Sequence, residues 1–256
     1  MGIPAPEELA PLAGDLGGWV WRVVESQRYT QTRRLVATHT DQERLEELLE
    51  GSKPAYQPGT EHLDYLLKTP FRYRPPKRGG SRFRRPYAPY GVFYAAEHRR
   101  TALAELAFHR YRFFYLSEGT GLPRQEAQLT AFAAGYRTAA GLDLTTGELA
   151  HGREQWHHPA DYSAAQALGA TAAEAGIGAI RYGSVRDPAV DARGEPAGRN
   201  VGILAPGAFD PPHHTSPQTW YLFLGEVEAN ARRALAGPHE QYDFPRALFE
   251  MPAPPD

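Results

Sequence analysis

The sequence contains no cysteine, and that absence excludes several classes of protein. Disulfide scaffolds, zinc sites built on thiolates and cysteine nucleophiles all need this residue. Long apolar runs are also missing, since no stretch approaches the ~18 residues that a membrane-spanning helix requires. The N-terminal stretch MGIPAPEELA has neither the basic start nor the apolar core of a secretory signal. These absences predict a cytoplasmic protein without membrane contact.

Net charge is almost absent as well. The 256 residues carry a formal charge of −2 at pH 7, so no global field draws the chain to nucleic acid or to a membrane. Hydrophobic residues make up 41% and charged residues 23%, the balance of a globular protein with a real core. No internal repeat, glycine-rich dinucleotide loop or P-loop occurs. We expect one domain over residues 1–256, with a peripheral N-terminal leader and a peripheral proline-rich tail.

Histidine provides no convincing metal site. The residues His157 and His158 are adjacent, and so are His213 and His214. Neighbouring side chains on a helix or strand point apart, so each pair would clamp a metal ion poorly. We therefore expect no metal.

Strand-like and helical segments are mixed along the chain. Strands are expected at residues 19–26, 91–96, 127–139, 177–184, 199–206 and 219–227. Helices are expected at residues 38–51, 61–67, 97–115 and 159–176. Thr40 and Glu43 form a capping box for the first helix, while Gly51 and Gly176 are expected to end the first and the last. Because strands and helices do not alternate regularly, the pattern favours the α+β class.

Positive charge gathers in one segment, residues 71–85, which contains no acidic residue. Its basic residues are Arg72, Arg74, Lys77, Arg78, Arg82, Arg84 and Arg85. The planar fork of arginine can hold phosphate through two parallel hydrogen bonds, and Gly79 and Gly80 allow close backbone approach. The segment suits a phosphate-bearing ligand, although spacing alone describes a solvated loop equally well.

Aromatic residues are interleaved with these charges. They are Phe71, Tyr73, Phe83, Tyr87 and Tyr90. Basic and aromatic side chains together also bind single-stranded nucleic acid, through stacking and neutralisation of the backbone. A nucleic-acid-binding module is therefore a second class of function, although the near-neutral total charge argues against it.

Glu105 is an acid inside the alanine- and leucine-rich helix TALAELAF. A buried carboxylate without a partner is costly, so most such residues have one. In a purely structural role, Glu105 would form an ion pair with an arginine of the basic segment. In a functional role, it would face a cleft with arginine on the other wall. It would there hold a ribose hydroxyl or stabilise positive charge on a sugar carbon.

The sequence provides weaker evidence for a catalytic role of two other residues, Ser184 and Glu97, when each is considered alone. Ser184 lies in RYGSVRDP, where Tyr182 occupies the first glycine position of a nucleophile elbow, and a serine at a strand end is ordinarily a turn residue. A two-carboxylate glycosidase would need a second acid near Glu105. Glu97 is eight residues earlier, at the expected helix start, where an acid favours the helix dipole.

Five segments taken together resemble the RES-domain family, in its larger branch. They are WRVVESQ…RRLV, LEELLEGSKP, FRYRPPKRGGSRF, GVFYAAEHRRTALAELAFHRYRFF and IRYGSVRD…RNVGILAPGAF, in order over about residues 19–210. The family is named for an arginine, a glutamate and a serine. By this resemblance the three are Arg82 in GSRF, Glu105 in TALAEL and Ser184 in YGSVRD.

Two further positions match the family. Its tyrosine falls on Tyr94 in GVFYAA, and an upstream arginine falls on Arg22 in WRVV. Some smaller members have a tyrosine after that arginine, where this chain has Val23. Many relatives have glycine or asparagine after the arginine that matches Arg82, where this chain has Phe83 and then Arg84. The resemblance therefore does not predict the shape of this loop.

The resemblance implies an α+β fold with a mixed sheet and flanking helices, similar to ADP-ribosyltransferase toxins. It implies NAD as substrate, with no further cofactor, and the role of a toxin neutralised by a helical antitoxin of Xre type. This chain is not expected to contact nucleic acid directly. Activities of the family are NAD breakdown by water or phosphate, which makes a glycohydrolase or a phosphorylase, and ADP-ribosyl transfer to a protein.

The residues themselves fit this chemistry. Arg82, with Arg22, suits the pyrophosphate of NAD. Nicotinamide leaves readily, so the protein must mainly orient the ribose and stabilise positive charge, which Glu105 can do. Tyr94 could stack on or cover a ring, and Ser184 could bond the ribose or the carboxylate of Glu105. We therefore expect Glu105, Arg82 and Ser184 to be catalytic, and Arg82, Tyr94, Arg22 and Ser184 to bind NAD.

Overall fold

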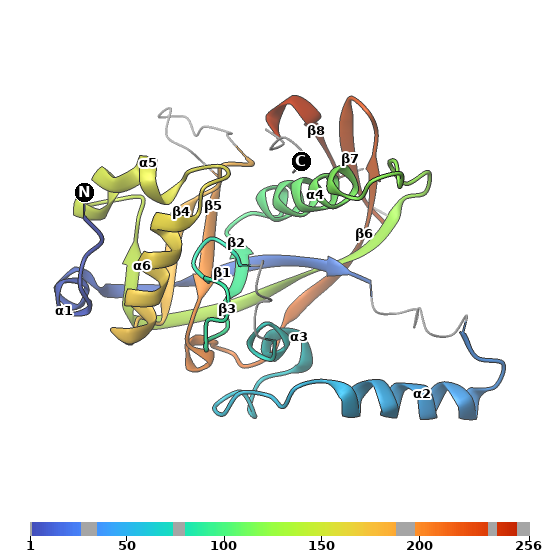
Figure 1. Ribbon diagram of the computed structural model, residues 1–256, viewed down its shortest axis with the longest axis horizontal. Helices are drawn as coiled ribbons and strands as arrows, with labels where there is room; N and C mark the ends of the chain where they lie inside the picture. Colours follow the sequence, from blue (N-terminus) through green and yellow to red (C-terminus); the bar gives the residue numbers. More distant parts are fainter. Residues whose placement is uncertain (1, 27–34, 74–79, 188–197, 235–239, 250–256) are drawn as a thin grey trace.

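The computed structural model describes residues 2–26, 35–73, 80–187, 198–234 and 240–249. Within these ranges the strands are β1 Gly14–Glu25, β2 Phe93–Ala96, β3 Ala127–Asp143, β4 Ala179–Gly183, β5 Arg199–Ile203, β6 Thr215–Leu224, β7 Glu228–Arg233 and β8 Gln241–Pro245. The α-helices are α1 Pro6–Leu9, α2 His39–Ser52, α3 Tyr65–Lys68, α4 Arg99–Leu116, α5 Arg153–Trp156 and α6 Ser163–Glu174. Figure 1 shows this mixture, which confirms the α+β class.

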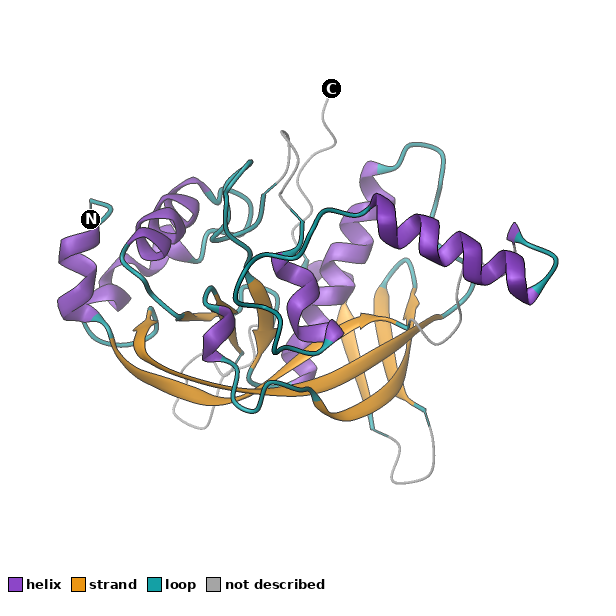
Figure 2. Ribbon diagram, turned by 90° about the horizontal axis from the view of Figure 1, so that it is seen from below, coloured by secondary structure: helices purple, strands orange, loops and turns teal. Residues whose placement is uncertain are grey.

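The strands form one mixed sheet in the order β1-β2-β5-β4-β3-β6-β7-β8. Among the described strands β3 and β4 pair in parallel, and the other pairs are antiparallel. Because β1 also pairs with β3, the strands β1, β2, β5, β4 and β3 close into a ring, and β6, β7 and β8 extend from β3. Figure 2 shows the long strands running beneath most of the helices. The mixed sheet with flanking helices is as expected.

Helix α4 carries the acid that the sequence singled out. Its alanine- and leucine-rich sequence favours a helix, and one face packs on the extension of the sheet. Leu103 and Phe108 of α4 belong to one apolar cluster with Leu129 of β3 and Trp220 of β6, all nearly inaccessible to water. This packing holds α4 firmly, so the side chains on its other faces are well placed.

The expected helices are present with shifted ends. α2 begins after Thr38, whose hydroxyl accepts a hydrogen bond from the Asp41 amide, so the capping box expected at Thr40 is wrong. Gly51 does not end α2, which runs through it to Ser52. α3 is shorter than expected, because Asp64 caps it and thereby sets its first residue at Tyr65. The stop expected at Gly176 is confirmed, since its φ of +72° follows the end of α6 at Glu174.

The C-terminal part of the sheet was predicted least well. The strand expected at 219–227 is a hairpin instead, in which β6 ends at Leu224 and β7 begins at Glu228. β7 and β8 were missed because their sequences, EANARR and QYDFP, are short and polar. Only Ala229 and Ala231 of β7 are buried, and alanine has little preference for strands.

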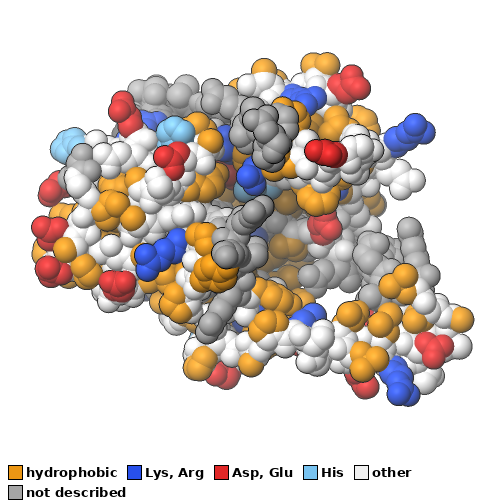
Figure 3. Space-filling model, viewed as in Figure 1, with side chains coloured by type: hydrophobic (Ala, Val, Ile, Leu, Met, Phe, Trp, Pro, Cys, Tyr) orange, Lys and Arg blue, Asp and Glu red, His pale blue; other side chains and the backbone are white. Residues whose placement is uncertain are grey.

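Some predicted features lie outside the described residues. They include Arg74, Lys77, Arg78 and Gly79 of the basic segment and most of the proline-rich tail. No helix in the described part of the chain is long and apolar enough to cross a membrane. Charged side chains of both signs are scattered over the face drawn in Figure 3, in keeping with the small net charge.

Candidate functional site

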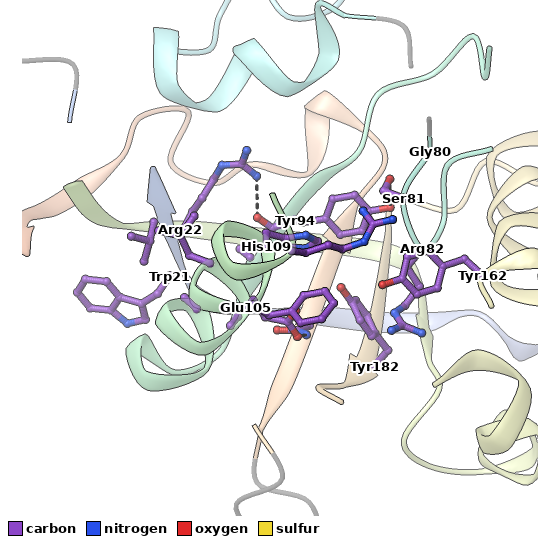
Figure 4. A pocket seen from close by; sticks show the side chains of 18 residues that line it. Trp21, Arg22, Gly80, Ser81, Arg82, Tyr94, Glu105, His109, Tyr162 and Tyr182 are labelled. Carbon is purple, nitrogen blue, oxygen red and sulfur yellow. Dashed lines mark hydrogen bonds between the residues drawn. The ribbon is translucent and has the colours of Figure 1, made fainter. Parts of the chain in front are cut away.

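A cavity of about 390 Å³ opens where β1 and β2 lose contact. The two strands are paired at Trp21 and Ala96 alone within the described residues. Next to this pair, Nη1 of Arg22 donates to the Tyr94 carbonyl at 2.7 Å, which bridges β1 and β2 by a side chain. Arg22, Arg82, Tyr94 and Glu105 line the cavity, so the structure brings four of the five predicted residues together (Figure 4).

The carboxylate of Glu105 is held by two neutral donors. Its Oε1 accepts from Oγ of Ser184 at 2.7 Å and from Nδ2 of Asn200 at 2.6 Å. No described residue forms an ion pair with Glu105, so the structure does not show an ion pair to the basic segment there. Neutral donors orient the carboxylate without cancelling its charge. The half-buried side chain lies on the cavity wall, which is the arrangement that the functional role requires.

Ser184 is the predicted residue that does not line the cavity. It is 7% exposed and lies behind Glu105, at the end of β4. Besides donating to Glu105, its hydroxyl accepts from the amides of Arg186 and Asp187, each at 3.1 Å. The hydroxyl is therefore fully engaged within the protein. Of the two partners expected for Ser184, the structure shows the Glu105 carboxylate.

The turn that follows Ser184 fastens α4 to the sheet. Asp187 accepts from Oγ1 of Thr101 at 2.8 Å and forms an ion pair with Arg100. The guanidinium of Arg186 lies 3.5 Å from the ring centre of Phe108. These contacts lie on either side of Glu105 along α4, so the turn fixes the helix segment that carries the acid.

Arg82 forms the opposite wall of the cavity. It is 8% exposed, and Nη1 donates to the carbonyls of Trp156 at 2.7 Å and His158 at 3.1 Å. Its guanidinium lies 4.6 Å from the ring centre of Tyr162. Within the described residues Nε and Nη2 of Arg82 bond to nothing, and no carboxylate pairs with it. These N–H groups are free to bind an anion.

Two other arginines line the same cavity. Arg22 lies over the Phe93 ring at 4.8 Å, and burial lowers its pKa to about 10, so it stays charged at neutral pH. Arg112 of α4 lies one turn beyond His109, which also lines the cavity. Neither arginine has a carboxylate partner within the described part of the chain. Three arginines and one glutamate therefore line the same cavity, an arrangement that suits a ligand bearing phosphate.

Tyr94 fixes the segment that carries Arg82. Its hydroxyl bonds to Oγ of Ser81 at 2.8 Å and accepts from the Phe83 amide at 2.9 Å. Burial raises the pKa of Tyr94 to about 12, so the hydroxyl is neutral in the physiological range. The ring lines the cavity, and a stacking role for it stays a prediction.

Four other described residues of segment 71–85 make contacts away from the cavity. Arg72 forms an ion pair with Glu50, and Nε of Arg84 donates to the Tyr90 carbonyl at 2.7 Å. Phe71 and Phe83 are fully buried in the core, so they cannot stack on bases. Of the described basic residues of the segment, Arg82 lines the cavity, whereas Arg85 and the aromatic Tyr73 are exposed to solvent.

Sequence reasoning missed several residues of the site. Asn200 holds Glu105, while Tyr182 and Tyr162 line the cavity. In the view of Figure 4, Tyr182 lies between Glu105 and Arg82. A polar signal was present for Asn200, because its amide directly precedes the apolar end of β5, Val201 to Ile203. Nothing local distinguished the tyrosines from core residues.

At least one histidine of each adjacent pair has a structural partner. Nε2 of His157 accepts from the Gly183 amide at 2.8 Å. Burial lowers the pKa of His157 to about 4, and the positive charges of Arg82 and Arg153 add to this shift. His214 bonds to Asp64. Within the described ranges no three His, Asp or Glu side chains are grouped to hold a metal ion.

The arrangement of an arginine, a glutamate and a serine can now be compared with known proteins. The sequence model of the RES domain matches residues 55–224. The chain belongs to the RES-domain family. The match includes Arg82, Tyr94, Glu105 and Ser184, whereas Arg22 precedes it.

A solved structure is also similar in shape. It is a chain of the M. tuberculosis MbcT–MbcA toxin–antitoxin complex, with a TM-score of 0.47 and 11% identity over 96% of this chain and 94% of that one. No curated protein matches the sequence.

Proposed function

We propose that this RES-domain protein cleaves the nicotinamide–ribose bond of NAD, and that it does so as the toxin of a toxin–antitoxin pair. The observation that supports the cleavage is the single oriented carboxylate of Glu105, which shares its cavity with three arginines that have no carboxylate partner among the described residues. By the family resemblance, the arginine, glutamate and serine for which the family is named are Arg82, Glu105 and Ser184, and the matched range 55–224 spans all three.

The reaction requires a negatively charged carboxylate more than it requires a proton donor. As the C1′–N bond breaks, its electron pair goes to nicotinamide, which leaves as a neutral molecule, and positive charge builds up on the sugar. Glu105 would stabilise that charge across the cavity. The acceptor oxygen then bonds to C1′ and loses its proton to solvent. No general acid is required, and the neutral Tyr94 hydroxyl is already bonded within the protein.

The arginines would bind the pyrophosphate and orient the ribose. Arg82 offers Nε and Nη2, and its stacking on Tyr162 limits its motion. Arg22 of β1 would contribute a second positive charge from the cavity wall. Binding at two phosphates places the sugar carbon relative to Glu105, and such orientation supplies a large part of the rate in reactions of this kind.

Nicotinamide release from NAD tests the proposal. Purified protein is incubated with NAD, with and without inorganic phosphate, and products are followed by chromatography and mass. Glu105→Gln keeps the shape and removes the charge, so we expect release to fall by about 10²-fold or more with folding intact. Glu126→Gln is the matched control, because Glu126 pairs with Arg232 away from the cavity and should leave the rate unchanged. Near-normal turnover by Glu105→Gln would refute the role of Glu105.

The same experiment identifies the acceptor. A product with the mass of ADP-ribose indicates water, and a product one phosphate heavier indicates phosphorolysis. If nicotinamide is released only when cell extract is added, labelled NAD will show whether ADP-ribose is transferred to a protein. Salt-dependent binding of oligonucleotides without any effect on NAD would instead support the nucleic-acid module.

The antitoxin part of the proposal has its own test. The family resemblance makes a helical protein of Xre type the expected partner. We expect expression of the wild-type chain alone to arrest growth with loss of cellular NAD, and co-expression of the antitoxin encoded beside it to restore growth. Growth arrest by Glu105→Gln equal to wild type would contradict the proposal.

A further inference from the structure

We propose that Asn200 is a positioning residue for this reaction: with Ser184 it binds one oxygen of Glu105, so that the other oxygen faces the ligand. This inference rests on the proposed function and adds a residue to the arginine, glutamate and serine of the family. Asn200 does not act on NAD itself but through Glu105.

The position of Asn200 in the sheet makes it a rigid support. It lies in β5, which pairs with β2 on one side and β4 on the other, and its direct partners are Ala96 and Tyr182. The residue is 3% exposed. A short amide on a strand that is bonded at both edges has little freedom, so its Nδ2 is held at 2.6 Å from Glu105 Oε1.

Both donors bind the same oxygen. Oγ of Ser184 and Nδ2 of Asn200 lie at 2.7 and 2.6 Å from Oε1. No described residue donates to Oε2, although a carboxylate accepts about four hydrogen bonds in all. Two donors, one in β5 and one directly after β4, prevent the carboxylate from rotating. Oε2 is thereby left for the cavity that Glu105 lines.

The neutrality of these donors is as important as their direction. An arginine in place of Asn200 would also orient Glu105, but it would cancel much of the negative charge. An amide and a hydroxyl leave that charge available for the cation that develops on the sugar. Asn200 therefore meets two requirements of the reaction, a fixed carboxylate and an uncompensated one.

Two substitutions distinguish a role of Asn200 in positioning Glu105 from a role in folding. Asn200→Leu removes the donor at similar size, and we expect kcat to fall about 10- to 100-fold while KM for NAD stays within about twofold. Asn200→Asp places a second carboxyl group against Glu105. At pH 8 the two carboxylates repel each other, whereas a protonated Asp at lower pH donates as the amide did, so we expect activity relative to wild type at the same pH to recover on acidification. His109 and Tyr182 also interact electrostatically with Glu105, and they are present in both proteins that this ratio compares.

The control is Asn230→Asp. Nδ2 of Asn230 donates to Asp243 between β7 and β8, so this variant makes the same chemical change against a carboxylate far from the cavity. Its pH profile should match wild type. Circular dichroism at each pH confirms that all variants are folded.

The outcomes are distinct. If wild type releases no nicotinamide, the proposed function fails, and with it this role. If wild type is active and Asn200→Leu keeps kcat within about twofold, or Asn200→Asp keeps the wild-type pH profile, the inference fails while the proposed function stands. A crystal structure of Asn200→Leu gives a second readout: we expect the Glu105 carboxylate to turn from its wild-type position, and an unmoved carboxylate would overturn the inference.

Discussion

At the scale of single residues, Ser184 is better suited to holding Glu105 than to attacking a substrate. Its hydroxyl donates to Glu105 and accepts from two backbone amides, so none of its capacity is left for the ligand. We expect Ser184→Ala to lower kcat for nicotinamide release about 10- to 100-fold with little change in KM. Ser117→Ala is the control, because Ser117 donates to the Phe113 carbonyl at the far end of α4. A covalent sugar adduct on Ser184, seen by mass, would contradict this role.

The sequence was sufficient to predict which residues carry the chemistry of the site, but not which residues hold them in place. Glu105 stands out because an acid interrupts an apolar helix, and the resemblance adds Arg82, Tyr94 and Ser184. Asn200 lies within the strand expected at residues 199–206, and the sequence does not place it near Glu105. It is 95 residues from Glu105 along the chain, and only the pairing of β5 with β2 and β4 brings the two together. Partners of this kind depend on tertiary structure, which local patterns do not contain.

At the scale of elements, Tyr94 connects β2 to the segment that carries Arg82. Tyr94→Phe removes bonds to Ser81 and to the Phe83 amide. We expect KM for NAD to rise about tenfold, more than kcat falls, and the free energy of unfolding to drop by about 1–2 kcal/mol. Steady-state kinetics and urea unfolding measure both. Tyr242→Phe, which removes a hydroxyl bonded to Glu240, should leave KM unchanged; equal KM values in both variants would mean that Arg82 is held by other contacts.

The elements that sequence predicted well are those with strong local signals. β3 has a long run of buried or half-buried residues, β1 has one from Val20 to Val24, and α4 and α6 are rich in alanine and leucine. β1 begins at Gly14 rather than at residue 19, because its first residues are mostly exposed and rich in glycine. The ends of helices were predicted less well, because more than one nearby residue can act as the N-cap. The N-cap of α2 is Thr38 rather than Thr40. β7 and β8 gain their structure from pairing with β6 and with each other, which their own residues barely favour.

At the scale of the whole molecule, the cavity forms because the ring of five strands is only weakly paired between β1 and β2. β1 and β2 share one described residue pair, and Arg22 bridges them beside it. The α+β class and a mixed sheet were predictable from composition, pattern and family. The strand order was not, because pairing of β1 with β3 joins residues more than 100 positions apart. The cavity therefore depends on register, a property of the assembled sheet.

Acid should weaken the whole fold through His157, which connects the end of α5 to β4. Burial lowers its pKa to about 4 from an ordinary value of 6.5, so the folded protein keeps it neutral, accepting from the Gly183 amide. Above pH 6.5 neither state binds the proton. As pH falls from 6.5 toward 4 the unfolded chain binds it first, so stability is lost across that window, by about 2–3 kcal/mol at pH 4.5.

Urea unfolding at pH 7.5 and pH 4.5 measures this loss. Carboxylates such as Asp64 and Asp143, whose pKa values are lowered by hydrogen bonds despite burial, also weaken the fold in acid. The comparison is therefore with His157→Gln, whose amide oxygen can accept from Gly183 but does not titrate. We expect this variant to lose about 2–3 kcal/mol less than wild type between the two pH values. The exposed His62→Gln should behave as wild type. Equal losses in wild type and His157→Gln would show that His157 does not link acid to unfolding.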